Sequence, residues 1–312
     1  MKFIDYKGNS AYCYSNSLSM LLASIDEQIP PTLIEAIAGV GLGAFSHPDS
    51  NICFFSNFEG LPDQAISKCL RILGYRFKES ASLDPEDLPL ETIKEVVKDG
   101  PLLLGPLDMG FLKYDPYAEQ SSGSDHYVLM YDIDDEKVYL HDPAGYPFVS
   151  LKIIDLKTAW RADSIQYKRG YYRYWCVPKR LKTPSSDEIY EKTLLNFKTT
   201  YREGEVSAKK MNVLYDEQAI IKMANNIREG LLTTREEEVL NSFVFPISAR
   251  RALDLAKFLE IRSPNLSDTK YKQAKLFGEC IVDISGDSRP ELTKNVEELA
   301  KLEEKFKKEL LR

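Results

Sequence analysis

The feature that most constrains this chain is residues 125–143, Asp-His-Tyr-Val-Leu-Met-Tyr-Asp-Ile-Asp-Asp-Glu-Lys-Val-Tyr-Leu-His-Asp-Pro. Two segments rich in Val, Leu, Ile and Tyr flank an acidic cluster, which predicts a β-hairpin with a short polar turn. If the turn centres near Asp134, His126 lies opposite Asp142 or one place away. Cross-strand Cβ atoms are about 4.5–5.5 Å apart, so this imidazole and this carboxylate can hydrogen-bond. Such a carboxylate fixes the tautomer of a general-base histidine and stabilises its imidazolium form.

A candidate nucleophile, Cys13, lies far upstream at the head of a segment with helical spacing. Backbone N–H groups and the positive end of the dipole at a helix N-terminus favour the thiolate form. Cysteine is also among the residues most often buried, so a core thiol is the competing interpretation. His126 and Asp142 are likewise compatible with an ordinary strand histidine and an ordinary turn residue. The apolar residues that predict the helix recur at three- and four-residue intervals: Leu18, Leu21, Leu22 and Ile25.

Composition limits the classes of protein that this chain can be. Its 312 residues, 43% of them hydrophobic, can build one large core or two medium ones. A formal charge of −7 and a pI near 5.3 argue against a nucleic-acid binder. No run approaches the roughly 18 apolar residues of a membrane span, and the first residues lack the apolar core of a signal peptide. We therefore expect a cytoplasmic protein.

Cysteine usage indicates reduced thiols. The five cysteines are an odd number without paired spacing, so the sequence predicts neither a disulfide framework nor a zinc site. We expect no metal and no cofactor. Four cysteines lie in apolar helical or strand-like segments and are predicted to be core thiols: Cys53, Cys69, Cys176 and Cys280.

The chain changes character near residue 180. Residues 1–180 mix helical and strand patterns, including an apolar run at 101–108 that predicts a strand buried on both faces. Residues 186–312 show helical spacing throughout, after a short linker. We therefore predict an α+β domain over 1–180 and an all-helical domain over 186–312, on the acceptor side of the site. The loop at 109–123 is predicted to be either a mobile substrate-side loop or a plain surface loop.

The segment at 125–143 resembles the His-strand-turn-strand-Asp-Pro signature of papain-like cysteine peptidases that process bacteriocin leaders. Residues 1–180 resemble more closely the N-terminal domain of the butirosin biosynthesis protein H family. In that family an N-terminal Cys, a Gly-Pro-Val-Leu-Val-Gly-Val-Asp-like strand, a Tyr-rich loop and a Gly-His-Tyr-Val-Val hairpin follow in this order. The matching stretches here are Cys13, Gly100 to Asp108, Tyr114 and the hairpin segment.

This resemblance implies a papain-like fold and a cysteine acyltransferase of antibiotic biosynthesis. The butirosin relative moves an amino-acyl group from an acyl-carrier-protein thioester to an aminoglycoside amine. The resemblance thus implies an acyl-carrier protein or another thioester donor as partner, and a small-molecule amine as acceptor. It implies Cys13 as nucleophile, His126 as base and Asp142 as orienting residue, and it places Asp108 and Tyr114 on the substrate side.

The chain departs from the leader peptidases around the nucleophile. Those peptidases have Cys-Gly there, and a Gln six residues earlier that helps to form the oxyanion hole; here Tyr14 follows the cysteine and Lys7 takes the earlier place. Asn9 is the nearest amide side chain, and it either donates to an oxyanion or shapes the Gly-Asn-Ser turn. These departures weaken the peptidase interpretation more than the acyltransferase one. A peptidase or amide hydrolase is therefore the alternative, and a non-catalytic binding protein on the same fold is a third.

An acidic carrier protein needs a basic surface to dock on this acidic chain. A solvated edge strand and linker explains the same positive charges equally well. The cations that would form the docking surface are Lys168, Arg169, Arg173, Lys179, Arg180 and Lys182.

Overall fold

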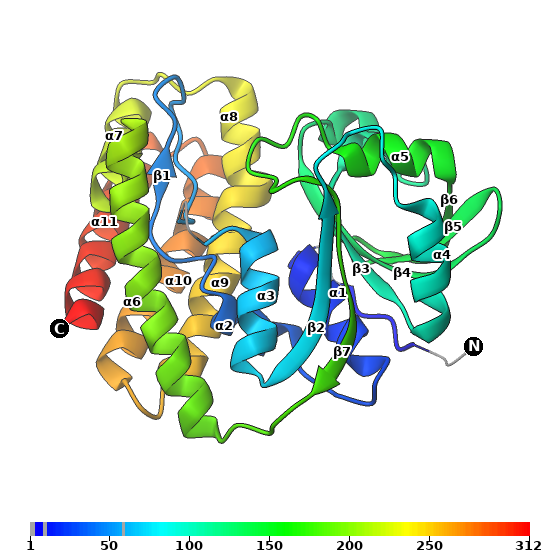
Figure 1. The fold of residues 1–312 in the computed structure, drawn as a ribbon. Coiled ribbons are helices and arrows are strands. Elements are labelled where there is room, and N and C mark those ends of the chain that lie inside the picture. The colour runs from blue at the N-terminus through cyan, green and yellow to red at the C-terminus, as the bar shows by residue number, and fades with distance from the viewer. Residues whose placement is uncertain (1–3, 9–10, 58–59) are drawn as a thin grey trace. The chain divides into compact units, whose positions relative to one another are not determined.

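The computed structural model describes residues 4–8, 11–57 and 60–312 (Figure 1). The chain divides into two compact units, the first formed by residues 1–34 and 62–186 and the second by residues 35–61 and 187–312. The division after residue 186 coincides with the predicted linker. Residues 35–61, which the sequence analysis assigned to the first domain, belong instead to the second unit.

The first unit is built on a six-stranded antiparallel sheet with the strand order β2-β7-β3-β4-β5-β6. The predicted hairpin is confirmed, because β4 and β5 pair directly. β3 is buried along its whole length, as its continuous apolar sequence predicts. The six strands are β2 (Tyr75–Ser82), β3 (Leu102–Asp108), β4 (Asp125–Ile133), β5 (Lys137–Asp142), β6 (Tyr146–Lys152) and β7 (Tyr171–Arg180).

Helices cover both faces of this sheet (Figure 1). On one face, α4 (Leu90–Asp99) and α5 (Ile153–Arg161) share a hydrophobic core with alternate strand residues such as Leu102 and Met130. On the other face, α1 (Cys13–Ala23) is held to β4 and α3 (Pro62–Ile72) to β7. The anchoring hydrogen bonds run from Ser17 Oγ to the Tyr127 carbonyl at 3.0 Å and from Trp175 Nε1 to Ser67 Oγ at 2.8 Å. The mixture of helices and antiparallel strands is an α+β architecture.

The second unit is mainly helical, but the prediction of an all-helical domain is wrong. β8 (Leu214–Tyr215) pairs antiparallel with β1 (Phe45–Ser46), a contact that depends on the segment at 35–61. The apolar residues of that segment, such as Cys53 and Phe55, join the core of the C-terminal helices, which explains why it groups with them. The helices are α6 (Ser186–Met211), α7 (Asp216–Arg228), α8 (Thr234–Val239), α9 (Phe245–Leu259), α10 (Pro264–Ser285) and α11 (Arg289–Leu311), while α2 (Pro31–Ala38) spans the boundary between units.

None of the helices in the described part of the chain is both long and apolar enough to cross a lipid bilayer.

Candidate active site

Cys13 is the first residue of α1 and is partly exposed, whereas the rest of the helix is buried. The residue before it, Tyr12, has left-handed backbone angles of φ 59° and ψ 44°. For a residue with a Cβ this conformation costs about 1–3 kcal/mol, and such strain clusters at functional sites. Ser17, one turn further along, fixes the helix to β4 through its bond to the Tyr127 carbonyl. The thiol is therefore presented at the positive end of a rigidly held helix.

His126 and Asp142 form a buried pair, with Nε2 and Oδ1 2.6 Å apart. The predicted contact is present, but the strand register differs from the one we expected. Leu129 faces His141, so the same register would place Asp142 two residues away from His126 along β4. Such diagonal neighbours are within reach of longer side chains. The pair thus forms across a diagonal rather than between facing residues.

The Cys13 thiol lies near enough to the His126 ring to act on the pKa of that ring. Because Nε2 is bound to Asp142, Nδ1 is the ring nitrogen that remains for a contact with the thiol. Burial alone lowers the pKa of His126, but the charge and hydrogen bond of Asp142, with smaller contributions from Cys13, hold that pKa well above its usual value of 6.5. Asp142 therefore favours the imidazolium form of His126. Thiol, imidazole and carboxylate in series are the parts of an activated nucleophile, its proton carrier and an orienting group.

Both carboxylate oxygens of Asp142 accept hydrogen bonds. Oδ1 also accepts the Ala144 N–H at 2.7 Å, and Oδ2 accepts the Tyr114 hydroxyl at 2.7 Å. Burial raises the pKa of Asp142, but the charge of His126 and these hydrogen bonds outweigh it and leave that pKa below its usual value. Tyr114, expected on the substrate side, thus donates its hydroxyl proton to the Asp142 carboxylate.

Tyr6 is a site neighbour that the sequence analysis missed. Its hydroxyl donates to the Asp142 carbonyl at 2.7 Å and accepts the Gly145 N–H at 3.0 Å. It therefore clamps the backbone of the turn that carries Asp142. Tyr6 is separated from Asp142 by 136 residues and lies in an irregular segment, so no periodic pattern identifies it.

Asp108, predicted to lie on the substrate side, holds together the loop that follows β3. The residue is buried, and its Oδ1 accepts the N–H groups of Gly110 at 2.8 Å and Gly123 at 3.0 Å. Its Oδ2 accepts the Ser164 hydroxyl. With both oxygens engaged, Asp108 fixes the two ends of the loop that follows β3.

Of the two residues discussed for the oxyanion hole, Asn9 and Lys7, the structure describes Lys7. Asn9 lies outside the described residues. Lys7, at the place of the peptidase Gln, donates to Ser19 Oγ at 2.9 Å and to Gln28 Oε1 at 3.2 Å. Because Ser19 lies six residues beyond Cys13 along α1, the helical rise puts it about 9 Å from the start of the helix. The Lys7 ammonium is therefore held away from the thiol.

The remaining cysteines and His141 behave as core residues. Cys53, Cys69, Cys176 and Cys280 are buried, and burial raises the pKa of Cys176 to about 11 and that of Cys280 to about 12. His141 is buried among Tyr131, Phe148 and Tyr6, and its Nδ1 accepts the Phe148 N–H at 3.2 Å. Burial lowers the pKa of His141.

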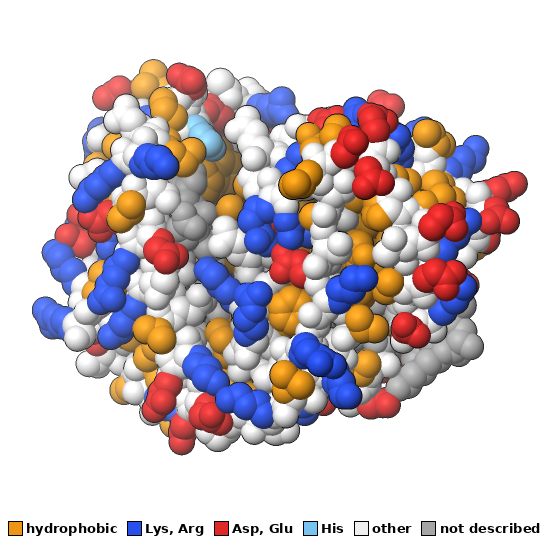
Figure 2. Space-filling model, in the orientation of Figure 1, with side chains coloured by type: hydrophobic (Ala, Val, Ile, Leu, Met, Phe, Trp, Pro, Cys, Tyr) orange, Lys and Arg blue, Asp and Glu red, His pale blue; other side chains and the backbone are white. Residues whose placement is uncertain are grey.

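The predicted basic docking surface is largely neutralised within the fold. Lys168 donates to the carbonyls of residues 161 and 162, Arg169 pairs with Asp63, and Arg180 pairs with Glu27. Arg173 pairs with Glu79. On the face drawn in Figure 2, positive and negative side chains are interspersed. These contacts favour the interpretation of a structural edge strand over a carrier-docking surface.

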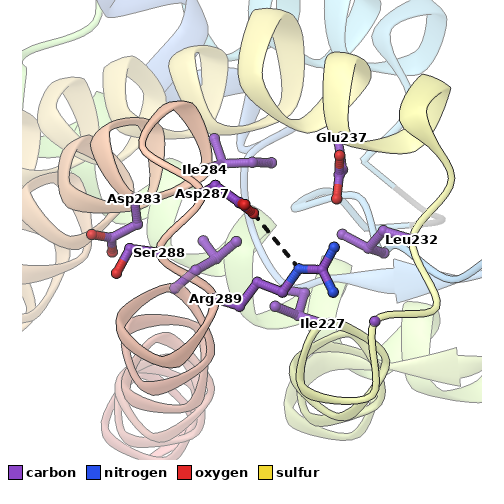
Figure 3. A pocket seen from close by; sticks show the side chains of 10 residues that line it. Ile227, Leu232, Glu237, Asp283, Ile284, Asp287, Ser288 and Arg289 are labelled. Atoms are coloured by element: carbon purple, nitrogen blue, oxygen red, sulfur yellow. Dashed lines mark ion pairs between the residues drawn. The ribbon is translucent and has the colours of Figure 1, made fainter.

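The cavity in Figure 3 belongs to the second unit. It is lined by Ile227, Leu232, Glu237 and Arg289, and Arg289 Nε lies 3.8 Å from Asp287 Oδ1. Its volume of about 30 Å³ suits a water molecule rather than a substrate. Within the described ranges, His, Cys, Asp and Glu side chains do not gather in groups of three or more that could hold a metal ion.

Comparison with known proteins places the whole chain in a family. It is 40% identical over 309 residues to the "Uncharacterized protein YobF" of Bacillus subtilis (strain 168), and the match covers 98% of each chain. The chain belongs to the YobF family. Residues 210–311 match the YobF C-terminal domain. In this YobF family member, that domain takes in most of the C-terminal helices of the second unit, and Cys13, His126 and Asp142 lie outside it.

Proposed function

We propose that this YobF family member is a cysteine acyltransferase that carries an acyl group on Cys13 and passes it to an amine. The observation that carries the proposal is the continuous series from the Cys13 thiol through the His126 ring to Asp142, with 2.6 Å between Nε2 and Oδ1. We further propose that the first unit has a papain-like fold, because a helix that starts at the cysteine packs against an antiparallel sheet that supplies the histidine and the aspartate.

The chemistry begins with attack of the Cys13 thiolate on the carbonyl carbon of a thioester. The carbonyl oxygen takes the charge, and backbone N–H groups at the start of α1 stabilise it. Collapse of the intermediate breaks the donor carbon–sulfur bond, and the departing thiolate takes the proton of the His126 imidazolium. A neutral amine then attacks the acyl-cysteine and gives a proton to His126. The second collapse releases the amide and regenerates the Cys13 thiolate.

One observation favours a second candidate, a papain-like peptidase or amide hydrolase. The Asp142 carboxylate holds the pKa of His126 well above its usual value, so the imidazolium is ready to protonate a leaving amine. An amide donor needs that proton, whereas a thioester donor needs it less because a thiolate leaves readily. Water in place of the acceptor amine then completes hydrolysis.

The test is intact mass spectrometry after incubation with an S-acyl-N-acetylcysteamine thioester and, separately, with a peptide. We expect an acyl adduct on Cys13 that disappears in Cys13→Ala, forms slowly in His126→Ala, and is released as an amide by a primary amine. His47→Ala is the matched control, because His47 is exposed and lies in the other unit. Peptide cleavage without thioester loading would support the hydrolase. If neither reaction occurs and the Cys13 thiol is unreactive, the result would support a non-catalytic binding protein.

A further inference from the structure

The loop that follows β3 is closed at its base. The Met109 N–H donates to the Ser124 carbonyl at 3.0 Å, and Asp108 accepts N–H groups from near both ends of the loop. Loops of up to about 16 residues whose ends touch in this way are compact Ω-loops, packed by their own side chains and often functional. Tyr114 projects from this loop to Asp142.

Tyr114 is held by its ring as well as by its hydroxyl. The centroid of its ring lies 5.6 Å from that of Tyr146, and the Tyr146 hydroxyl donates to Asp115 Oδ1 at 3.0 Å in the same loop. The Tyr114 hydroxyl donates to Asp142 Oδ2 at 2.7 Å. Burial, with the nearby charge of Asp142, raises the pKa of Tyr114 well above its usual value, so the phenol remains a donor across the working pH range.

We infer that Tyr114 is a positioning residue that orients the Asp142 carboxylate toward His126, an inference that rests on the proposed function. A carboxylate group can rotate about the bond that joins it to Cβ. A hydrogen bond at one of its oxygens leaves the other oxygen in need of a partner. Asp142 is 1% exposed, so water does not freely replace a lost partner. The Tyr114 hydroxyl on Oδ2 therefore keeps Oδ1 on His126 Nε2, and the closed loop holds that hydroxyl in place.

Several charged or titratable groups act on this contact. Asp115 and Tyr146 act on Tyr114. His126, itself beside Cys13, and Tyr6 act on Asp142. The Tyr114 hydrogen bond stabilises the ionised carboxylate more than the protonated acid, so its removal makes Asp142 easier to protonate. His126 is paired with an ionised Asp142 both before and after it loses its own proton, so the alkaline titration of His126 changes little.

The decisive experiment is nitrogen NMR of protein labelled with ¹⁵N-histidine. The chain has three histidines, so the label marks three side chains. The Nε2 resonance of His126 reports protonation of Asp142, its hydrogen-bond partner. In Tyr114→Phe we expect the acid transition of that resonance to move up by about one pH unit, the size of a hydrogen bond to a charged group. 3-Fluorotyrosine is a stronger hydrogen-bond donor than tyrosine. In a variant with 3-fluorotyrosine at position 114, we therefore expect the acid transition of the His126 resonance to move to lower pH. We also expect thioester loading of Cys13 in Tyr114→Phe to fall about threefold to tenfold.

Matched controls separate positioning from loop stability. Tyr146→Phe removes the tether to Asp115 and leaves the Asp142 contact, and Tyr117→Phe makes the same change at an exposed place in the loop. Both are expected to leave the acid transition and the loading rate unchanged, even where Tyr146→Phe lowers the melting temperature. In an Asp142→Asn background, Tyr114→Phe should have little further effect on loading.

Failure of the positioning role of Tyr114 can be distinguished from failure of the proposed function. If wild-type Cys13 loads and Tyr114→Phe titrates and loads like wild type, the positioning role is wrong while the proposed function stands. If wild-type Cys13 does not load, the proposed function is wrong, and the His126 resonance still decides whether Tyr114 governs Asp142, because it needs no substrate. Should Tyr114→Phe fail to fold, the fluorinated variant gives the answer: an unmoved transition would overturn the inference.

Discussion

Replacing Asp142 with asparagine tests the pair at the centre of the site. Asparagine keeps an oxygen that can accept the proton of His126 Nε2 but removes the negative charge. The two side chains are only 6% and 2% exposed, so solvent screens this charge weakly. A hydrogen bond to a charged group contributes about 1.5–3 kcal/mol and a neutral one about 0.5–1.5 kcal/mol. Asp142→Asn should therefore lower the free energy of unfolding by about 1–1.5 kcal/mol and the pKa of His126 by about one unit.

The pH dependence of this loss has a definite sign. The pKa of His126 is raised in the folded protein, so its contribution is complete below its unfolded value of about 6.5 and is lost as pH rises through the folded pKa. The pKa of Asp142 is depressed, so its contribution is present above its unfolded value of about 3.9 and is lost as pH falls through the folded pKa. The full difference in free energy of unfolding between wild type and Asp142→Asn should appear between about pH 4 and 6.5, and it should become smaller at alkaline pH.

Urea denaturation of both proteins at pH 5.5 and pH 9 measures this difference, and the ¹⁵N titration of His126 measures the shift in its pKa. Asp142→Ala is the comparison variant, because it leaves the buried imidazolium without a partner and should cost about 3–5 kcal/mol. Equal stabilities of wild type and Asp142→Asn at pH 5.5, with an unchanged His126 titration, would show that the two residues do not form an ion pair.

Three further predictions concern residues other than the proposed catalytic residues Cys13, His126 and Asp142. Ser17→Ala leaves the buried Tyr127 carbonyl without the hydroxyl that bonds it and should cost about 1–3 kcal/mol in urea denaturation. Glu303→Gln breaks a buried ion pair with Lys270 at 3.0 Å and should cost about 3–5 kcal/mol, whereas substitution of an exposed glutamate of α11 should change stability by less than about 0.5 kcal/mol. His141→Ala should lower stability by about 1–3 kcal/mol yet leave the rate of Cys13 loading unchanged; a large fall in that rate would give His141 a part in the chemistry.

Local sequence patterns were sufficient to predict the pieces of the candidate site. The cysteine stands where apolar helical spacing begins, and the hairpin brings His126 and Asp142 together because its ends are close in sequence. The exact register was not predictable, since Ile133 faces Val138 and the turn therefore centres between Asp135 and Glu136 rather than near Asp134. The side-chain contact tolerates that shift because a diagonal pair is still within reach.

Contacts between distant parts of the chain left no signal in the sequence. Tyr114 was noted for its place in a Tyr-rich loop, but its partner could not be inferred from that composition. Asp108 ends an apolar strand, as a binding residue often does, and yet its oxygens are filled by the backbone of its own loop. The two-residue pairing of β1 with β8 is too short for any alternation to be visible, so the strand within the helical region was missed.

The discontinuity of the second unit has a consequence for how the protein is made. The thiol of Cys53 packs against the sulfur of Met223, a partner that follows it by 170 residues. At about 5–20 residues per second, a ribosome needs roughly 10–30 s to supply that partner. Through this interval the apolar segment around Ile52 and Phe55 is outside the ribosome without the helices that bury it. The nascent chain must therefore shield this segment, or have it shielded by a chaperone, until the last third of the protein has been synthesised.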